Sequence, residues 1–157
     1  MGKGIIIFLG ALVTCLSMRG EEPSFRMEQL KMVEYRPTEQ AGDFSGEIEI
    51  GKIDTIPDWL RSLHGRSIST RGYMYPLDFE RGLTREFLFL PFDLTCYFGD
   101  FPQLDEFFIV FVEGAGFRPE LHMPSTVSGV LEIRESWESG IPVGLLFLKA
   151  TGVTYTQ

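Results

Sequence analysis

The residue in this chain with the most reactive side chain is Cys96, which lies in a stretch of aromatic and acidic residues. A thiolate can act as a nucleophile or bind a metal, but it forms readily only where a nearby cation lowers the thiol pKa. No basic residue lies between Arg85 and Cys96. The sequence therefore favours a buried, unreactive cysteine. The alternative is a thiol- or metal-dependent protein centred on Cys96.

Other metal-binding or catalytic patterns are weak. His64 and His122 are far apart and lack the matching cysteine or carboxylate spacing of a zinc site. The acidic residues that flank the cysteine lack the regular spacing of a calcium loop. These residues are Asp93, Asp100, Asp105 and Glu106. Phosphate-binding glycine loops, nucleophile elbows and metalloprotease helices are not found either, so we expect no cofactor and favour a non-enzymatic function.

The segment 92–102 is unusually aromatic for a connection between strands. Its aromatic residues are Phe92, Tyr97, Phe98 and Phe101. Such side chains either cap the end of the fold or form a docking surface; we expect capping for Phe98 and Phe101 and docking for Tyr97. An apolar centre with an acidic rim is typical of a recognition patch. We therefore predict a binding or accessory module that uses this loop, with an unknown extracytoplasmic protein or a small apolar ligand as partner.

The elements that would position this loop are mainly strands. Alternating or continuously apolar patterns predict strands over 66–74, 85–91, 106–113, 125–135 and 143–150, the last continuing toward Tyr155. Gly72 and Gly129 lie inside predicted strands, where glycine indicates a bend or a close backbone approach. The sequence therefore predicts a mostly β fold whose five strands form a small, strongly curled barrel.

The residues before these strands predict three further segments. Residues 47–53 alternate as a strand, and Pro57 to Leu63 predicts one short helix with Trp59, Leu60 and Leu63 facing a core. Residues 21–46 are predicted to form a flexible tether. Within it, Met27 to Tyr35 is compatible with either a short helix or an edge strand. The barrel domain is expected to span residues 47–157.

Residues 1–20 have the pattern of a signal peptide. Lys3 precedes the apolar run from Gly4 to Leu16, which suits a secretory signal and is too short for a membrane-spanning helix. Cleavage is expected after Ser17 or near Gly20. The alternative is a lipoprotein signal with lipid on Cys15, which would be the only route to a membrane. The protein is thus predicted to be exported and either periplasmic or secreted, with a lipid anchor on Cys15 as the alternative.

Charge and cysteine content narrow the classes of partner. The formal net charge of the chain is −8, and without residues 1–20, which hold two basic residues and no acidic one, it is −10. Nucleic-acid binding depends largely on basic side chains that neutralise phosphates, so we expect no nucleic-acid partner. Cleavage of the signal peptide would leave Cys96 as the single cysteine, which precludes an internal disulfide bond.

Several short motifs occur in a characteristic order. They are Leu63-His64-Gly65-Arg66, Gly72-Tyr73-Met74-x-Pro76-Leu77, Glu86-Phe87-Leu88-Phe89, Cys96-x-Phe98-Gly99 and Ser128-Gly129-x-Leu131. Together, over about Ile53 to Tyr155, they resemble an uncharacterised bacterial family, a domain of unknown function in exported proteins and lipoproteins. The resemblance implies an OB-like barrel and no established reaction. Relatives often carry paired cysteines or a Cys-x-His at the cysteine loop, whereas Tyr97 and Phe98 follow Cys96 here.

Overall fold

The computed structural model describes residues 24–40, 42–94 and 102–155. Most of these residues form strands, and the helices are short. The strands are β1 (Ser24–Phe25), β2 (Gly46–Glu49), β3 (Ser67–Pro76), β4 (Glu86–Leu90), β5 (Phe108–Val112), β6 (Ser125–Glu138) and β7 (Ile141–Tyr155). The helices are the 3-10 helices η1 (Met27–Met32) and η2 (Ile50–Lys52) and the α-helix α1 (Asp58–Arg61).

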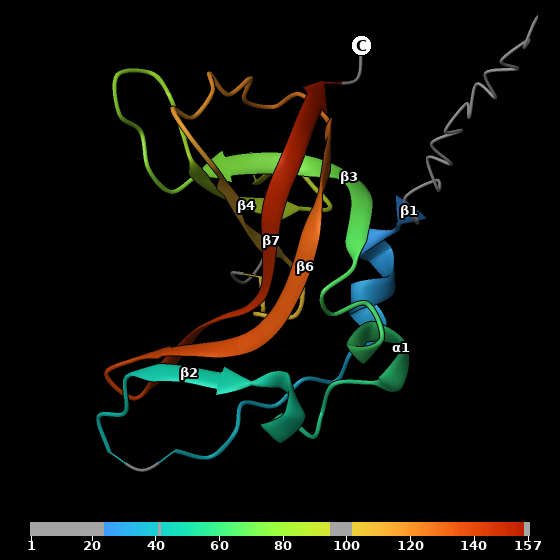
Figure 1. Cartoon of the computed structure of the whole chain (residues 1–157), viewed down its shortest axis with the longest axis vertical. Coiled ribbons are helices and arrows are strands. Elements are labelled where there is room, and N and C mark those ends of the chain that lie inside the picture. The colour runs from blue at the N-terminus through green and yellow to red at the C-terminus, as the bar shows by residue number, and fades with distance from the viewer. Residues whose placement is uncertain (1–23, 41, 95–101, 156–157) are drawn as a thin grey trace, which may run out of the picture.

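The strands form one mixed sheet in the order β1-β3-β4-β5-β7-β6-β2. An additional pairing between β3 and β6 joins the five central strands into a ring. The pairs β1–β3 and β5–β7 are parallel, and the other pairs are antiparallel. Figure 1 shows β6 and β7 as a long curved hairpin, with β2 lying along its far end. The predicted mostly β fold is confirmed, and each of the five predicted strand ranges overlaps one strand of the ring.

Two glycines allow the strands of this ring to approach closely. A Cβ atom at Gly72 would lie within 2.3 Å of the Leu90 carbonyl oxygen. At Gly129 it would lie within 2.3 Å of the Lys149 carbonyl oxygen, next to a register shift between β6 and β7. Any larger residue would force these backbones apart. The close approach that the glycines predicted is therefore present.

The main core fills the inside of the ring. Side chains alternate along β6, so that Val127, Leu131 and Ile133 are fully buried. Phe87, Phe89 and Phe108 from neighbouring strands are also fully buried, and the rings of Phe87 and Phe89 meet edge to face. Burying side chains of this size stabilises a fold by about 1.5–3 kcal/mol each. The interior is thus the principal source of stability.

The segment predicted as a tether contributes to this core. Phe25 of β1 is buried, η1 turns Met27 and Leu30 toward the core, and Val33, directly after η1, is buried as well. In Figure 1, β1 and η1 lie beside β3. At least residues 24–33 therefore belong to the packed structure and do not form a flexible tether.

The short helix and the end of β6 also differ in detail from the sequence expectation. In α1, Leu60 is fully buried, but Trp59 remains 37% exposed and stacks on Phe25 with the ring centroids 6.3 Å apart. β6 continues beyond the predicted end at Glu135, whose carboxylate is completely buried. It accepts hydrogen bonds from the Thr38 backbone N–H and the Trp137 Nε1–H, each at 2.9 Å. The bond from Thr38 attaches the segment before β2 to β6.

Candidate functional site

Most of the site residues predicted from sequence lie outside the described part of the chain. They are Cys15, Cys96, Tyr97, Phe98 and Phe101. Phe92 is described and is half-buried. It is therefore the one predicted site residue that can be placed in the fold, together with the ends of its loop, residues 92–94 and 102–107.

These two ends cover an apolar outer face of the sheet. Leu88 of β4, Ile109 of β5 and Phe147 of β7 point away from the main core and form a second cluster with Leu90 and Phe107. Four further side chains from the loop ends and the sheet pack against this cluster: Phe92, Leu94, Leu104 and Phe111. Phe92 thus caps the outer face of the sheet, a packing role that the sequence had left as one of two possibilities.

A groove opens beside this covered face, along the outer side of β3. We call it the apolar groove, and its principal lining residues are Tyr73, Tyr75, Phe79, Leu90, Phe92 and Leu121. It encloses about 240 Å³. Strand alternation accounts for its floor, because Tyr73 and Tyr75 lie on the face of β3 opposite the buried Met74. The groove therefore presents aromatic and aliphatic surface to solvent.

Exposed apolar side chains surround the groove. Tyr75 is 53% exposed, Phe79 is 62% exposed and Leu121 is 46% exposed. Leu77 and Met123, from the same two connections, are 50% and 39% exposed. Apolar surface concentrated in one place marks an interaction site more often than the same residues scattered singly. The groove is thus an apolar concavity bordered by exposed apolar side chains.

The connection between β3 and β4 is held in place by side-chain hydrogen bonds. Asp78 Oδ1 accepts hydrogen bonds from the backbone N–H groups of Arg85 and Glu86 at 2.9 and 2.8 Å, and from the Thr84 hydroxyl at 2.7 Å. These bonds, led by the one from Arg85, hold the pKa of Asp78 below its usual value. Arg81 and Gly82 have φ angles of +54° and +80°, as in a type I′ hairpin turn. Phe79 is therefore carried by an ordered hairpin.

The opposite wall of the groove is fixed by polar contacts. His122 adopts a φ of +64°, and its Nδ1 lies 3.0 Å from Asp93 Oδ2. This contact joins the connection before β6 to the residues after β4. The Tyr155 hydroxyl accepts a hydrogen bond from the Glu120 backbone N–H at 3.0 Å. Three separate connections thus meet at the groove in a defined arrangement.

The chemistry that this arrangement supports is binding. Across residues 24–40, 42–94 and 102–155, no three His, Cys, Asp or Glu side chains are grouped so as to hold a metal ion. The aromatic and aliphatic lining can fit the shape of an apolar ligand and remove it from water. The Asp93–His122 pair supplies polar groups at one edge. Ligand sites commonly combine such an apolar lining with a few placed polar groups.

Within the described ranges, no helix has the length and apolar character needed to cross a bilayer.

The comparisons with known proteins bear on the fold. No protein-family model matches this sequence, and no curated protein matches it. The structure is similar to the crystal structure of a DUF3299 family protein from Pseudomonas aeruginosa PAO1, with a TM-score of 0.56. The two chains are 21% identical, and the match covers 88% of this chain and 98% of the other. An uncharacterised bacterial protein therefore shares the fold, in agreement with the resemblance seen in the sequence.

Sequence reasoning missed most of the groove. Leu121 is distant in sequence from Tyr75 and Phe79, and the Asp93–His122 contact helps to hold its connection beside them. One signal was present in the sequence. Tyr73 belongs to the predicted strand 66–74 and Tyr75 follows its last residue, so continued alternation around Met74 places both aromatic residues on the solvent face.

Proposed function

We propose that this protein is an exported, non-enzymatic binding module that holds an apolar ligand, or the apolar part of an extracytoplasmic partner, in the apolar groove. The observation that carries the proposal is the concentration of exposed Tyr75, Phe79 and Leu121 around one concavity. Exposed apolar surface is costly in water unless a partner covers it. The ordered connections around the groove favour binding without a large rearrangement.

The arrangement of the ring supports this function by analogy. We interpret the ring as an OB-like barrel, because β3, β4, β5, β7 and β6 follow one another and β3 returns to β6. OB folds bind ligands on one face and with the neighbouring loops. Here the outer face of β4 and β5 is covered by the chain itself, so binding is assigned to β3 and the adjoining connections. The fold supports a binding function by analogy alone, and the argument for this function rests on the groove.

Export is the second part of the proposal. It rests on Lys3 and the apolar run of residues 4–16, which have the composition of a signal peptide. Mass spectrometry of the native protein should find a first residue near Met18 or Glu21, or a lipid on Cys15. A native protein that keeps Met1 and stays in the cytoplasm would remove this part of the proposal.

The binding function is tested with decanol, a neutral apolar probe, by titration calorimetry. Phe79→Ser should weaken decanol binding about tenfold, the typical effect of removing an aromatic contact at a binding site. Ile141→Ser is the matched control, because Ile141, the first residue of β7, is 63% exposed and Phe79 is 62% exposed. An equal effect of both substitutions, or no binding by the unsubstituted protein, would contradict the proposal.

A further inference from the structure

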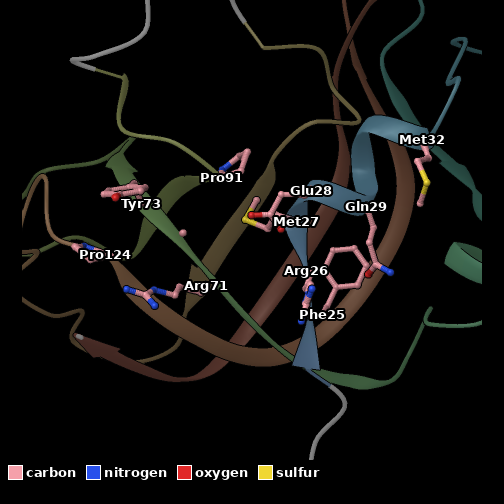
Figure 2. Close-up of a pocket in the computed structure, with 11 residues that line it drawn as sticks. Phe25, Arg26, Met27, Glu28, Gln29, Met32, Arg71, Tyr73, Pro91 and Pro124 are labelled. Atoms are coloured by element: carbon pink, nitrogen blue, oxygen red, sulfur yellow. The ribbon is translucent and has the colours of Figure 1, made fainter. Parts of the chain in front are cut away.

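A second pocket adjoins the apolar groove on the outer side of β3. It encloses about 770 Å³ and shares Tyr73 with the groove. We call it the arginine pocket, and the residues that matter here are Arg26, Gln29, Arg71 and Tyr73. Figure 2 shows Arg26 where β1 leads into η1, and Arg71 and Tyr73 along the neighbouring strand β3. The two concavities therefore form one continuous surface across Tyr73.

The sheet register brings the two arginines next to each other. β1 pairs with β3 in parallel, with Phe25 opposite Thr70. Arg26 and Arg71 follow this last pair, and the backbone of Arg26 remains extended with φ of −97° and ψ of 118°. Phe25 and Thr70 are buried, whereas both arginines are exposed. The two arginines therefore occupy neighbouring backbone positions on the outer side of the sheet, and Figure 2 shows the Arg71 side chain extending away from Arg26, toward Pro124.

This pair of charges has no counter-ion in the described structure. Neither Arg26 nor Arg71 takes part in an ion pair with another described residue. Glu28 also borders the pocket, so the formal charge of its lining remains positive, although the chain as a whole carries −8. Like charges on neighbouring strands repel each other. An anion placed between them would relieve that repulsion.

The spacing of residues along β3 places the arginine pocket next to the apolar groove. Arg71, Tyr73 and Tyr75 alternate on the outer face of the strand. At the rise of an extended strand, the four steps from Arg71 to Tyr75 span about 13 Å. A ligand with an anionic group at Arg71 and an apolar chain running past Tyr73 would reach the apolar groove.

We propose that the ligand of the apolar groove is a single-chain amphiphile with a terminal carboxylate, held by Arg71, with Arg26 adding positive charge to the same pocket. This inference rests on the proposed binding function and specifies its ligand. A groove of 240 Å³ has room for part of one hydrocarbon chain and not for the two chains of a phospholipid side by side. The Arg71 guanidinium can donate two parallel hydrogen bonds to a carboxylate, and Arg26 adds positive charge to the same pocket.

The test compares decanoate with decanol, which has a chain of the same length and no charge. The unsubstituted protein should bind decanoate about tenfold more tightly than decanol at low salt, and 0.5 M NaCl should remove most of this preference. Arg71→Gln and Arg26→Gln should each weaken decanoate binding about threefold, the scale of an exposed charge pair, and leave decanol binding unchanged. Lys52→Gln, an exposed lysine in η2, is the matched control and should change neither.

The outcomes separate the two proposals. Equal binding of decanol and decanoate, unaffected by the arginine substitutions, would overturn the carboxylate inference and leave the groove as a binding site. Binding of neither probe would overturn the groove itself. Vesicles of anionic phospholipid provide a further arm: capture by vesicles without decanoate binding would replace the single-chain carboxylate with a lipid surface and contradict the inference. Thermal melts of each variant should be unchanged, since these arginines are exposed.

Discussion

The outer side of the sheet has two regions that differ in what covers them. Tyr75 pairs with Leu88, Leu88 with Ile109, and Ile109 with Phe147, so these four side chains form one row across the sheet. Tyr75 is 53% exposed, whereas Leu88, Ile109 and Phe147 are 7%, 8% and 4% exposed. The change occurs between adjacent strands. We refer to these regions as the open face, on β3, and the covered face, on β4, β5 and β7.

The difference shows what the connection between β4 and β5 accomplishes. Its described ends bring Phe92, Leu94, Leu104 and Phe107 over the covered face. Within the described residues, the apolar side chains of β3 beside the groove remain partly exposed, as Tyr75 shows. Apolar residues on the covered face therefore serve stability, and those on the open face are available to a ligand. Each of the following predictions sharpens or breaks this distinction.

The largest effect is expected on the covered face. Phe107→Ala should lower the free energy of unfolding by about 3–5 kcal/mol, because Phe107 is only 3% exposed and its loss leaves a cavity. Phe79→Ala removes the same side chain from the open face and should change stability by less than about 0.5 kcal/mol. Urea unfolding of both variants measures the contrast. Equal losses would show that the open face also serves packing.

A somewhat smaller loss is expected where the ring closes beneath both faces. Gly129→Val should destabilise the protein by about 3 kcal/mol, because its side chain would collide with the Lys149 backbone. Gly152→Val is the control in the paired strand, since no atom lies within 4 Å of its added Cβ. The melting temperatures of the two variants should differ by more than 10 °C. Similar melting temperatures would mean that Gly129 is not needed for close approach.

On the open face, the expected effect is on binding and not on stability. Tyr75→Ser should weaken decanol binding about fivefold to tenfold, because Tyr75 lines the groove and is 53% exposed. Its melting temperature should stay within about 3 °C of the unsubstituted protein. Calorimetric titration and a thermal melt on the same sample separate the two effects. A large loss of stability with unchanged binding would place Tyr75 with the covered face.

The smallest effect concerns acid conditions and the hairpin that carries Phe79. Because hydrogen bonds lower the pKa of Asp78 in the folded protein, its contribution to stability is present above about pH 4, the unfolded pKa. That contribution is lost as pH falls through the lower folded pKa. Asp78→Asn should therefore flatten the decline in stability below about pH 4. Asp54→Asn, at an exposed position, should retain the decline; if both variants behave alike, Asp78 does not organise the hairpin.

The sequence predicted the ring strands well, because their side chains alternate or are continuously apolar. It did not predict η1 as part of the core. Met27 and Leu30 are buried through tertiary packing against the sheet, and their local pattern is irregular. The groove could not be predicted for a similar reason. Its residues lie mostly in β3 and in three connections, and only the tertiary structure places Leu121 beside Tyr75. The sequence assigned Phe92 to a binding loop, and in the structure Phe92 packs on the covered face and borders the groove. The binding role of the loop 92–102 stays a prediction.

The most direct test of the account is an amide NMR titration of the assigned protein with decanol. The account predicts that the largest shift changes occur on the open face, at Tyr75, Phe79 and Leu121, with little change at Leu88 and Ile109. Changes concentrated at Leu88 and Ile109, or spread evenly over the strands, would contradict it, because decanol would then bind at the covered face or nowhere in particular.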